Sequence, residues 1–162
     1  MVKKESLTVI SNTGPLISLI LIDKLLLLEK MFGGLLISNQ VYKEIVNLEQ
    51  KGYLKKEVNK KWIKKLKSPK LDVLHRLHEG EASSISLALQ YDKSLFLTDD
   101  FEARNFASYI GLEVMGTAGV LLLAKKEKLI SNVGVLINTL VDNKRWLSKE
   151  LIIEILKRAN EL

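Results

Sequence analysis

Residues 80–107, GEASSISLALQYDKSLFLTDDFEARNFA, decide the fold class of this chain. Small and apolar residues recur at helical spacing and predict a helix over Glu79–Tyr91. The next stretch, Ser94–Thr98, is apolar on both faces, which is typical of a buried strand. Asp100 then fits the cap of a helix that runs to Ile110. A helix, a strand and a helix in this order indicate an α/β domain with a parallel sheet.

The same alternation continues on both sides of this stretch. Further strands are predicted over Leu7–Ser11, Leu35–Ser38 and Glu113–Met115. Further helices are predicted over residues 16–21, 24–32, 41–48, 117–125 and 131–141, and from Ser148 onward. Leu71–His78 predicts a short helix, whereas Lys61–Lys67 fits either an edge strand or a helical turn. We therefore expect a mostly parallel sheet of four or five strands, covered on both faces, in one domain over residues 1–162 with helices in 131–161 packed on it.

Composition excludes several classes of protein. The 162 residues suffice for one domain with its own core. The absence of Cys excludes a disulfide framework, a thiolate metal site and a Cys nucleophile. The longest uncharged run, residues 6–22, contains Asn-Thr-Gly-Pro, which excludes a membrane-spanning helix and the core of a signal peptide. We expect a cytoplasmic protein.

The net charge of +6 is distributed unevenly. Residues 51–70 hold nine Lys and one Glu, a charge of +8, so the other 142 residues together carry −2. A solvated insert and an RNA-binding patch both fit this lysine stretch.

Polar side chains follow two of the predicted strands. Asn12 comes after the first strand, and Asp99 and Asp100 come after the third. In parallel sheets ligands bind beyond these carboxyl ends. Glu44 borders the apolar stripe of its helix, and Glu81 lies near a helix N-terminus, where the dipole favours an anion.

Carboxylates directed into a protein are costly unless they are paired or bound to a cation. Oxygen ligands without Cys favour Mg²⁺ or Mn²⁺. Such an ion suits the hydrolysis of phosphodiester bonds, because it polarises the phosphate and activates water.

Each candidate residue also has a plain structural role. Glu44 fits a solvated helix residue, Glu81 and Asp100 fit helix caps, and Asn12 fits an ordinary turn. A metal-dependent nuclease, a binding module without turnover and a phosphoacceptor receiver therefore remain alternatives. Receivers carry their acid pair after the first strand, and the later position of the pair here disfavours that class.

Four stretches of the sequence carry a resemblance to a known family. They are VISNTGPLISL at 9–19, LLISNQVYKEIV at 35–46, the stretch 80–107 quoted above, and GLEVMGTAGVLLLAKKEKLI at 111–130. On these motifs the chain resembles the PIN-domain superfamily, the fold of VapC-type toxin ribonucleases, and within it the DUF3368-type group. The resemblance implies a three-layer α/β/α fold, a site for Mg²⁺ (or Mn²⁺) and metal-dependent endoribonuclease activity.

The resemblance also implies roles for individual residues. Thr98 falls on the small hydroxyl residue before the strand-end acid and, with Arg104, is an expected RNA contact. The implied catalytic acids are Glu44, Glu81, Asp99 and Asp100, and the implied metal ligands are Asn12, Glu44, Glu81 and Asp99.

Asn12 departs from the family pattern, because the superfamily normally has its first Asp at this position. The neutral amide removes one negative charge from the site. At ~4 Å and an effective dielectric near 20, one charge is worth roughly 4 kcal/mol before screening. We therefore expect weakened metal binding by three remaining carboxylates.

Two further stretches carry the predictions about partners. In the lysine stretch, we expect RNA contacts from Lys60, Lys61, Lys64 and Lys65. Residues 16–31 are apolar nearly all round, which predicts a surface for a second copy or for an antitoxin segment. PIN-domain toxins, which the chain resembles, generally dimerise. Alternatively, the C-terminal helix covers this surface through Leu151, Ile152 and Ile155.

Overall fold

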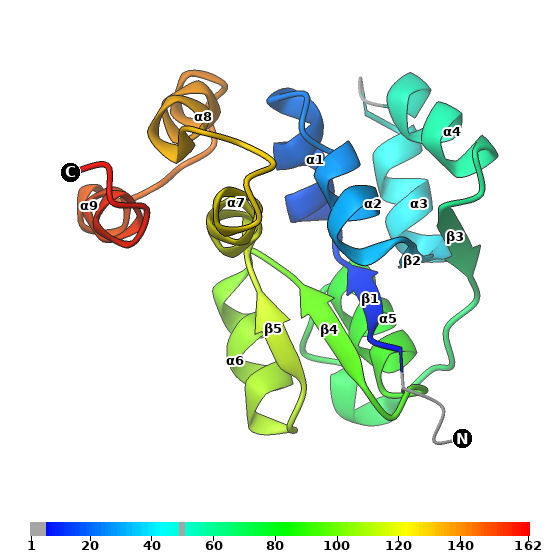
Figure 1. Cartoon of the computed structure of the whole chain (residues 1–162). Coiled ribbons are helices and arrows are strands. Elements are labelled where there is room, and N and C mark those ends of the chain that lie inside the picture. The colour runs from blue at the N-terminus through cyan, green and yellow to red at the C-terminus, as the bar shows by residue number, and fades with distance from the viewer. Residues whose placement is uncertain (1–5, 49–50) are drawn as a thin grey trace, which may run out of the picture.

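A parallel sheet forms the middle layer of the protein (Figure 1). The computed structural model describes residues 6–48 and 51–162, and in this part five strands pair in the order β3-β2-β1-β4-β5. The strands are β1 (Thr8–Ser11), β2 (Leu35–Ser38), β3 (Ile63–Leu66), β4 (Ser94–Leu97) and β5 (Glu113–Met115). Since β1 pairs with both β2 and β4, the strand order reverses beside β1. In parallel sheets this reversal marks the usual position of a binding site, at the carboxyl ends of the strands.

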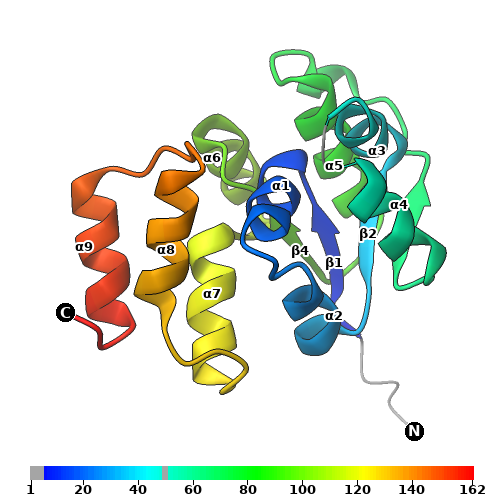
Figure 2. The same ribbon diagram turned by 90° about the horizontal axis from the view of Figure 1, so that it is seen from above.

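Helices cover both faces of the sheet, as the sequence predicts. The helices are α1 (Thr13–Leu21), α2 (Leu26–Phe32), α3 (Asn39–Val46), α4 (Lys51–Asn59), α5 (Glu79–Ala88), α6 (Phe101–Tyr109), α7 (Thr117–Lys126), α8 (Val133–Asp142) and α9 (Lys149–Arg158). Leu95 and Leu97 of β4 point into the large core under α1 to α4 and α7, whereas Phe96 packs with α5 and α6 on the other face. The α/β/α layering is thereby confirmed. Figure 2 shows α7, α8 and α9 side by side at one end of the molecule.

The lysine stretch contains an unpredicted helix, α4, and the edge strand β3. Leu54 anchors α4 in the core, and Trp62 is buried with its indole N–H donating to Glu57 at 2.8 Å. Parallel pairing of Ile63–Leu66 with Leu35–Ser38 of β2 decides for the strand in β3. The predicted helix over Leu71–His78 is wrong, because only one 3-10 turn, Asp72–Leu74, forms there.

Residues 16–31 are covered within one chain. Leu16, Leu19, Leu25 and Leu28 are fully buried, and Ile155 of α9 belongs to the same core. The exposed apolar surface expected for this stretch is therefore absent from the described structure. The cover comes mainly from α3 and α7 for α1, and from α7 and β2 for α2. Contrary to the alternative, α9 packs mainly on α7 and α8, and its Leu151 is exposed. The leucines therefore no longer argue for a second copy.

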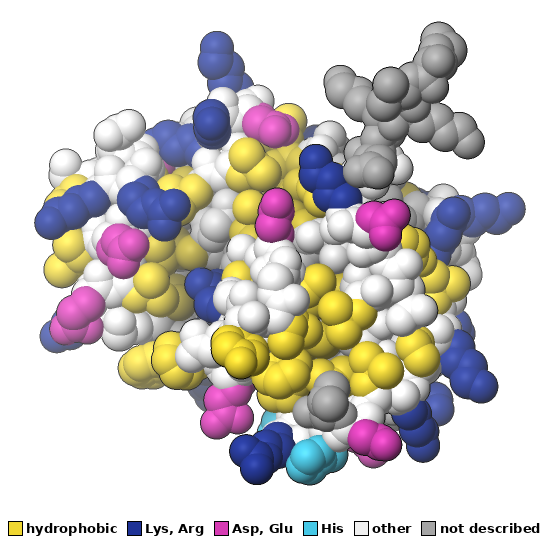
Figure 3. Space-filling view, turned by 90° about the horizontal axis from the view of Figure 1, so that it is seen from below, with side chains coloured by type: hydrophobic (Ala, Val, Ile, Leu, Met, Phe, Trp, Pro, Cys, Tyr) yellow, Lys and Arg dark blue, Asp and Glu magenta, His cyan; other side chains and the backbone are white. Residues whose placement is uncertain are grey.

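The surface of the described residues carries its basic side chains unevenly. In Figure 3, Lys and Arg gather along the right-hand margin, the side where α4 and β3 lie, and a hydrophobic area occupies the middle of this face. None of the described helices has the length and apolar character that crossing a bilayer requires.

Candidate functional site

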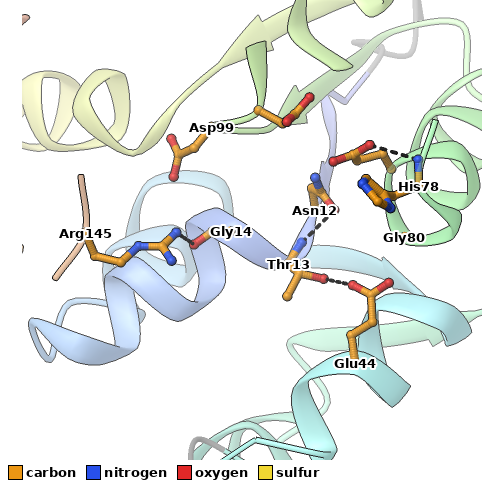
Figure 4. A pocket seen from close by; sticks show the side chains of 10 residues that line it. Asn12, Thr13, Gly14, Glu44, His78, Gly80, Asp99 and Arg145 are labelled. Atoms are coloured by element: carbon orange, nitrogen blue, oxygen red, sulfur yellow. Dashed lines mark hydrogen bonds between the residues drawn. The ribbon is translucent and has the colours of Figure 1, made fainter. Parts of the chain in front are cut away.

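A pocket of about 420 Å³ lies at the carboxyl ends of β1 and β4 (Figure 4). Five separate parts of the chain meet there: the start of α1, the helix α3, the start of α5, the β4–α6 junction and the loop between α8 and α9. The lining residues are Asn12, Thr13, Gly14, Glu44, His78, Gly80, Glu81, Asp99, Asp100 and Arg145. All the acids and the amide singled out in the sequence therefore surround one pocket.

Asn12 and Thr98 tie the ends of the two central strands together. Asn12 is buried, and its side-chain oxygen accepts a hydrogen bond from the Thr13 backbone N–H at 2.8 Å, which caps α1. Its amide nitrogen donates to the Thr98 hydroxyl at 3.4 Å. The same hydroxyl accepts from the Asp100 backbone N–H at 3.2 Å. Thr98 is fully buried, so the expected RNA contact is corrected to a structural role in placing Asn12 and Asp100.

Glu44 reaches the pocket from α3, where one neighbour binds its carboxylate and another leaves space for it. Thr13 donates its hydroxyl to Glu44 Oε2. On the other side Gly80 leaves room for the carboxylate, because a Cβ on Gly80 would approach Glu44 Oε1 to 2.5 Å. Glu44 is half-buried, not a fully solvated helix residue. The position of the Glu44 carboxylate therefore depends on the absence of a side chain at residue 80 of α5.

Glu81 lies where negative charges act on one another. Its carboxylate accepts from the His78 backbone N–H at 3.1 Å, so the predicted cap at the start of α5 exists. The pKa of Glu81 is raised, first by burial and then by the negative charge of Asp100, with a smaller contribution from Glu44. The cap at the start of α5 thus coexists with a cluster of carboxylates that favours the protonated form of Glu81.

The two consecutive aspartates have different environments. Asp99 is exposed and accepts from the Thr117 backbone N–H at 2.7 Å and from the Thr117 hydroxyl at 2.6 Å. Figure 4 places its carboxylate on the side of the pocket where Arg145 lies. Asp100 caps α6 by accepting from the Ala103 backbone N–H at 2.7 Å, and its charge acts on Glu81. Asp100 rather than Asp99 therefore belongs electrostatically with Glu81.

Arg145 is a pocket residue that sequence reasoning missed. It lies in the loop between α8 and α9, and its guanidinium donates to Ser18 Oγ at 3.0 Å and to the Gly14 carbonyl at 3.3 Å. The charge faces a pocket that is otherwise acidic. No sequence signal could identify it, because its partners are more than 120 residues away in the chain. His78 also lines the pocket while remaining exposed.

The remaining predicted RNA contacts lie outside this pocket. Arg104 is exposed, donates to the Thr98 carbonyl at 3.5 Å and lines a neighbouring groove. Four exposed lysines line neither hollow: Lys60 and Lys61 in the turn between α4 and β3, and Lys64 and Lys65 in β3. Lys60 pairs with Glu57 at 3.0 Å, and the Lys65 ammonium lies 4.2 Å from the centre of the Tyr42 ring. Their role in RNA binding stays a prediction.

Comparison with known proteins places this fold and pocket in a family. A family model described as a PIN domain, DUF3368, matches residues 8–161. The chain belongs to this family of PIN domains. No curated protein matches the chain. PIN domains are generally metal-dependent nucleases, so the fold is of a nuclease type.

The side chains of this PIN domain fit a hard divalent cation by their chemistry. The donors round the pocket are carboxylate, amide and hydroxyl oxygens, the ligands that Mg²⁺ and Mn²⁺ prefer. The raised pKa of Glu81 indicates negative charge that a cation would neutralise. Among the described residues no three Asp, Glu or His side chains already converge closely enough to hold a metal ion. Thr13 and Thr117 hold two of the acids, Glu44 and Asp99, by hydrogen bonds.

Proposed function

We propose that this PIN domain is a metal-dependent endoribonuclease of the VapC-like type. One observation carries the proposal: Glu44, Glu81 and Asp100 come from three distant elements and surround one pocket with Asn12. Burial, and after it the charges of Asp100 and Glu44, raise the pKa of Glu81. Carboxylates are gathered at such cost mainly where they bind a cation or exchange protons. A divalent ion in an acidic pocket serves phosphodiester hydrolysis.

Asn12, Glu44, Glu81 and Asp100 would hold Mg²⁺ or Mn²⁺ in this proposal. The bound ion would polarise the phosphate, lower the pKa of water and shield the developing charge. Asp100 here takes the ligand position that the family resemblance implies for Asp99, because the charge of Asp100, and not that of Asp99, contributes to the raised pKa of Glu81.

The chain's own residues supply binding and orientation around that centre. Arg145 offers a guanidinium to a phosphate oxygen, since it is a cation in the lining and its fork suits phosphate. Asp99 orients the start of α7 by accepting hydrogen bonds from Thr117. Thr98 holds Asn12 and Asp100 at a fixed separation from behind.

A second candidate function is an RNA- or protein-binding PIN fold without turnover. Asn12 favours it, since the neutral amide leaves the pocket one carboxylate short of the family pattern. A toxin role with an antitoxin partner, a cytoplasmic location and a homodimer are further proposals that follow from VapC-like membership. Co-expression with and without a candidate antitoxin, read out as cell growth, tests the toxin role.

The experiment that tests the nuclease is a comparison of Asp100→Asn with Asp99→Asn. The two changes are chemically identical and adjacent, and Asn is also a good helix cap, so α6 is retained. Cleavage of a fluorophore-labelled RNA in Mn²⁺ should fall at least about 100-fold for Asp100→Asn and much less for Asp99→Asn. The reverse order would assign the metal to Asp99, and no cleavage by the unmodified protein in either metal would favour the binding module.

A further inference from the structure

A second, larger groove adjoins the acidic pocket. It has a volume of about 1240 Å³ and runs along β5, α7 and α9 to the loop between α8 and α9. Asp99 and Arg145 line both the groove and the pocket, so the two hollows adjoin at these two side chains. A chain of nucleotides with one phosphate at the acids would reach the groove by passing them.

Two aromatic side chains in this groove are almost fully exposed. Phe101 is 75% exposed and Trp146 is 85% exposed, and both line the groove. Each directly follows a pocket residue in the chain: Phe101 follows Asp100, and Trp146 follows Arg145. Single exposed aromatics are ordinary, but two of them on one groove beside an acidic pocket offer flat apolar faces next to the proposed site of chemistry.

The charged lining of the groove suits a polyanion. Arg104, Lys126, Arg145 and Arg158 line it, against the carboxylates of Asp99 and Glu154. The Arg158 guanidinium lies 3.9 Å from the Glu154 carboxylate, and both side chains are exposed. Such an ion pair is weak and leaves the guanidinium accessible to water. Cations interleaved with exposed aromatic faces are the usual features of surfaces that bind single-stranded nucleic acid.

We propose that Phe101 and Trp146 form a platform on which bases of the RNA stack beside the acidic pocket, with the phosphates held by Arg104 and Arg145. This inference rests on the proposed ribonuclease function and assigns the residues that hold the bases. Stacking needs bases that are not already stacked in a duplex, so the platform discriminates against double-stranded RNA. Every base has a π-face, so the selection tolerates different sequences. The lysines of α4 and β3 then contribute at most a secondary, long-range attraction.

The test uses Trp146 as its own reporter. The protein has two tryptophans, and Trp62 is buried under α4, so quenching of fluorescence by RNA reports on Trp146. All titrations use the Asp100→Asn background with Mg²⁺, and gels verify that the RNA stays intact. The probes are a labelled 12-nucleotide RNA, the same backbone with abasic central positions, and a hairpin duplex of equal charge.

The expected result is quenching by the single-stranded RNA that disappears in Trp146→Phe, which removes the indole but retains a stacking face. Fluorescence polarisation should show binding about 5- to 150-fold weaker for Trp146→Ala or Phe101→Ala, the range for the stacking of one base. The protein with both aromatic residues in place should bind the abasic RNA and the hairpin weakly. Its affinity for these two probes should match the affinity of Trp146→Ala or Phe101→Ala for the intact RNA. Tyr109→Ala is the matched control, since Tyr109 is 89% exposed at the far end of α6 and does not line the groove.

Two outcomes overturn the platform while leaving the ribonuclease proposal intact. One is equal binding by Trp146→Ala and Tyr109→Ala together with equal binding of intact and abasic RNA. The other is RNA cleavage by a protein whose Trp146 is shielded from acrylamide and whose mass by light scattering is twice that of one chain, because a second copy would then cover the groove. Absence of any RNA binding, with the metal-binding and cleavage assays also negative, rejects both proposals.

Discussion

Replacing Gly80 with Ala should separate the stability of this PIN domain from its activity. Gly80 is the second residue of α5, and the Cβ of an alanine there would lie 2.5 Å from Glu44 Oε1 and 2.6 Å from Glu44 Oε2. Ordinary van der Waals contact begins near 3.4 Å, so the carboxylate has to withdraw by about 0.9 Å. Because the obstacle is the end of a flexible side chain, Glu44 moves and the helix does not.

The consequences for stability nearly cancel. Alanine is favoured over glycine in a helix by roughly 0.5–1 kcal/mol. The moved carboxylate loses the hydrogen bond from Thr13, which costs about 0.5–1.5 kcal/mol. The free energy of unfolding should therefore stay within about 1 kcal/mol of the unmodified value. A displacement of this size at a reacting centre costs about 100-fold in rate.

The assays are urea unfolding and RNA cleavage in Mn²⁺, with Gly52→Ala as the control. Gly52 is the second residue of α4, and a Cβ there meets no atom of the described residues within 4 Å. Gly52→Ala should gain about 0.5–1 kcal/mol in stability and leave cleavage unchanged. If Gly80→Ala cleaves RNA at the full rate while remaining folded, then the position of Glu44 does not matter to the chemistry and the reasoning from the Gly80 contact fails.

Three further predictions concern charge. Asn12→Asp keeps the cap on Thr13 and restores a carboxylate, so Mn²⁺ should bind more tightly by calorimetry and cleavage should rise; no change would favour a binding module. The pKa of Glu81 is raised in the folded protein, so ionisation of Glu81 destabilises the fold as the pH rises. In urea unfolding, Glu81→Gln should therefore be more stable than the unmodified protein at pH 7 and equally stable below about pH 4, where the glutamate is protonated in both states. A difference in stability that persists in acid would contradict this. Replacing Lys60, Lys61, Lys64 and Lys65 with Ala should lower the salt dependence of RNA binding by about 0.7 in log–log slope for each phosphate that these side chains neutralise, and an unchanged slope would identify a solvated face.

Sequence patterns were sufficient for β1, β2 and β4, because strands buried on both faces are continuous apolar runs that need no knowledge of their neighbours. They left β3 undecided, because exposed lysines interrupt its apolar pattern. Leu35–Ser38 and Glu113–Met115 form at the predicted bounds. The same patterns failed where charge hides the apolar contacts, as in α4, where Leu54 is buried and Tyr53 and Val58 pack against the core between lysines. The patterns also gave a wrong prediction for residues 16–31. A hydrophobic pattern shows that the leucines must be buried, but it does not show which part of the chain packs against them.

The sequence by itself determined the fold class, the family resemblance and the set of polar residues at the strand ends. Local spacing carries that information, since a turn after a buried strand always falls at the edge of the sheet. Only the tertiary structure decided that Asp100 and not Asp99 acts on Glu81, that Gly80 makes room for Glu44, and that Arg145 enters the pocket. These relations join residues far apart in the chain, or distinguish adjacent ones by the direction of a side chain, and the spacing of residues along a sequence contains neither.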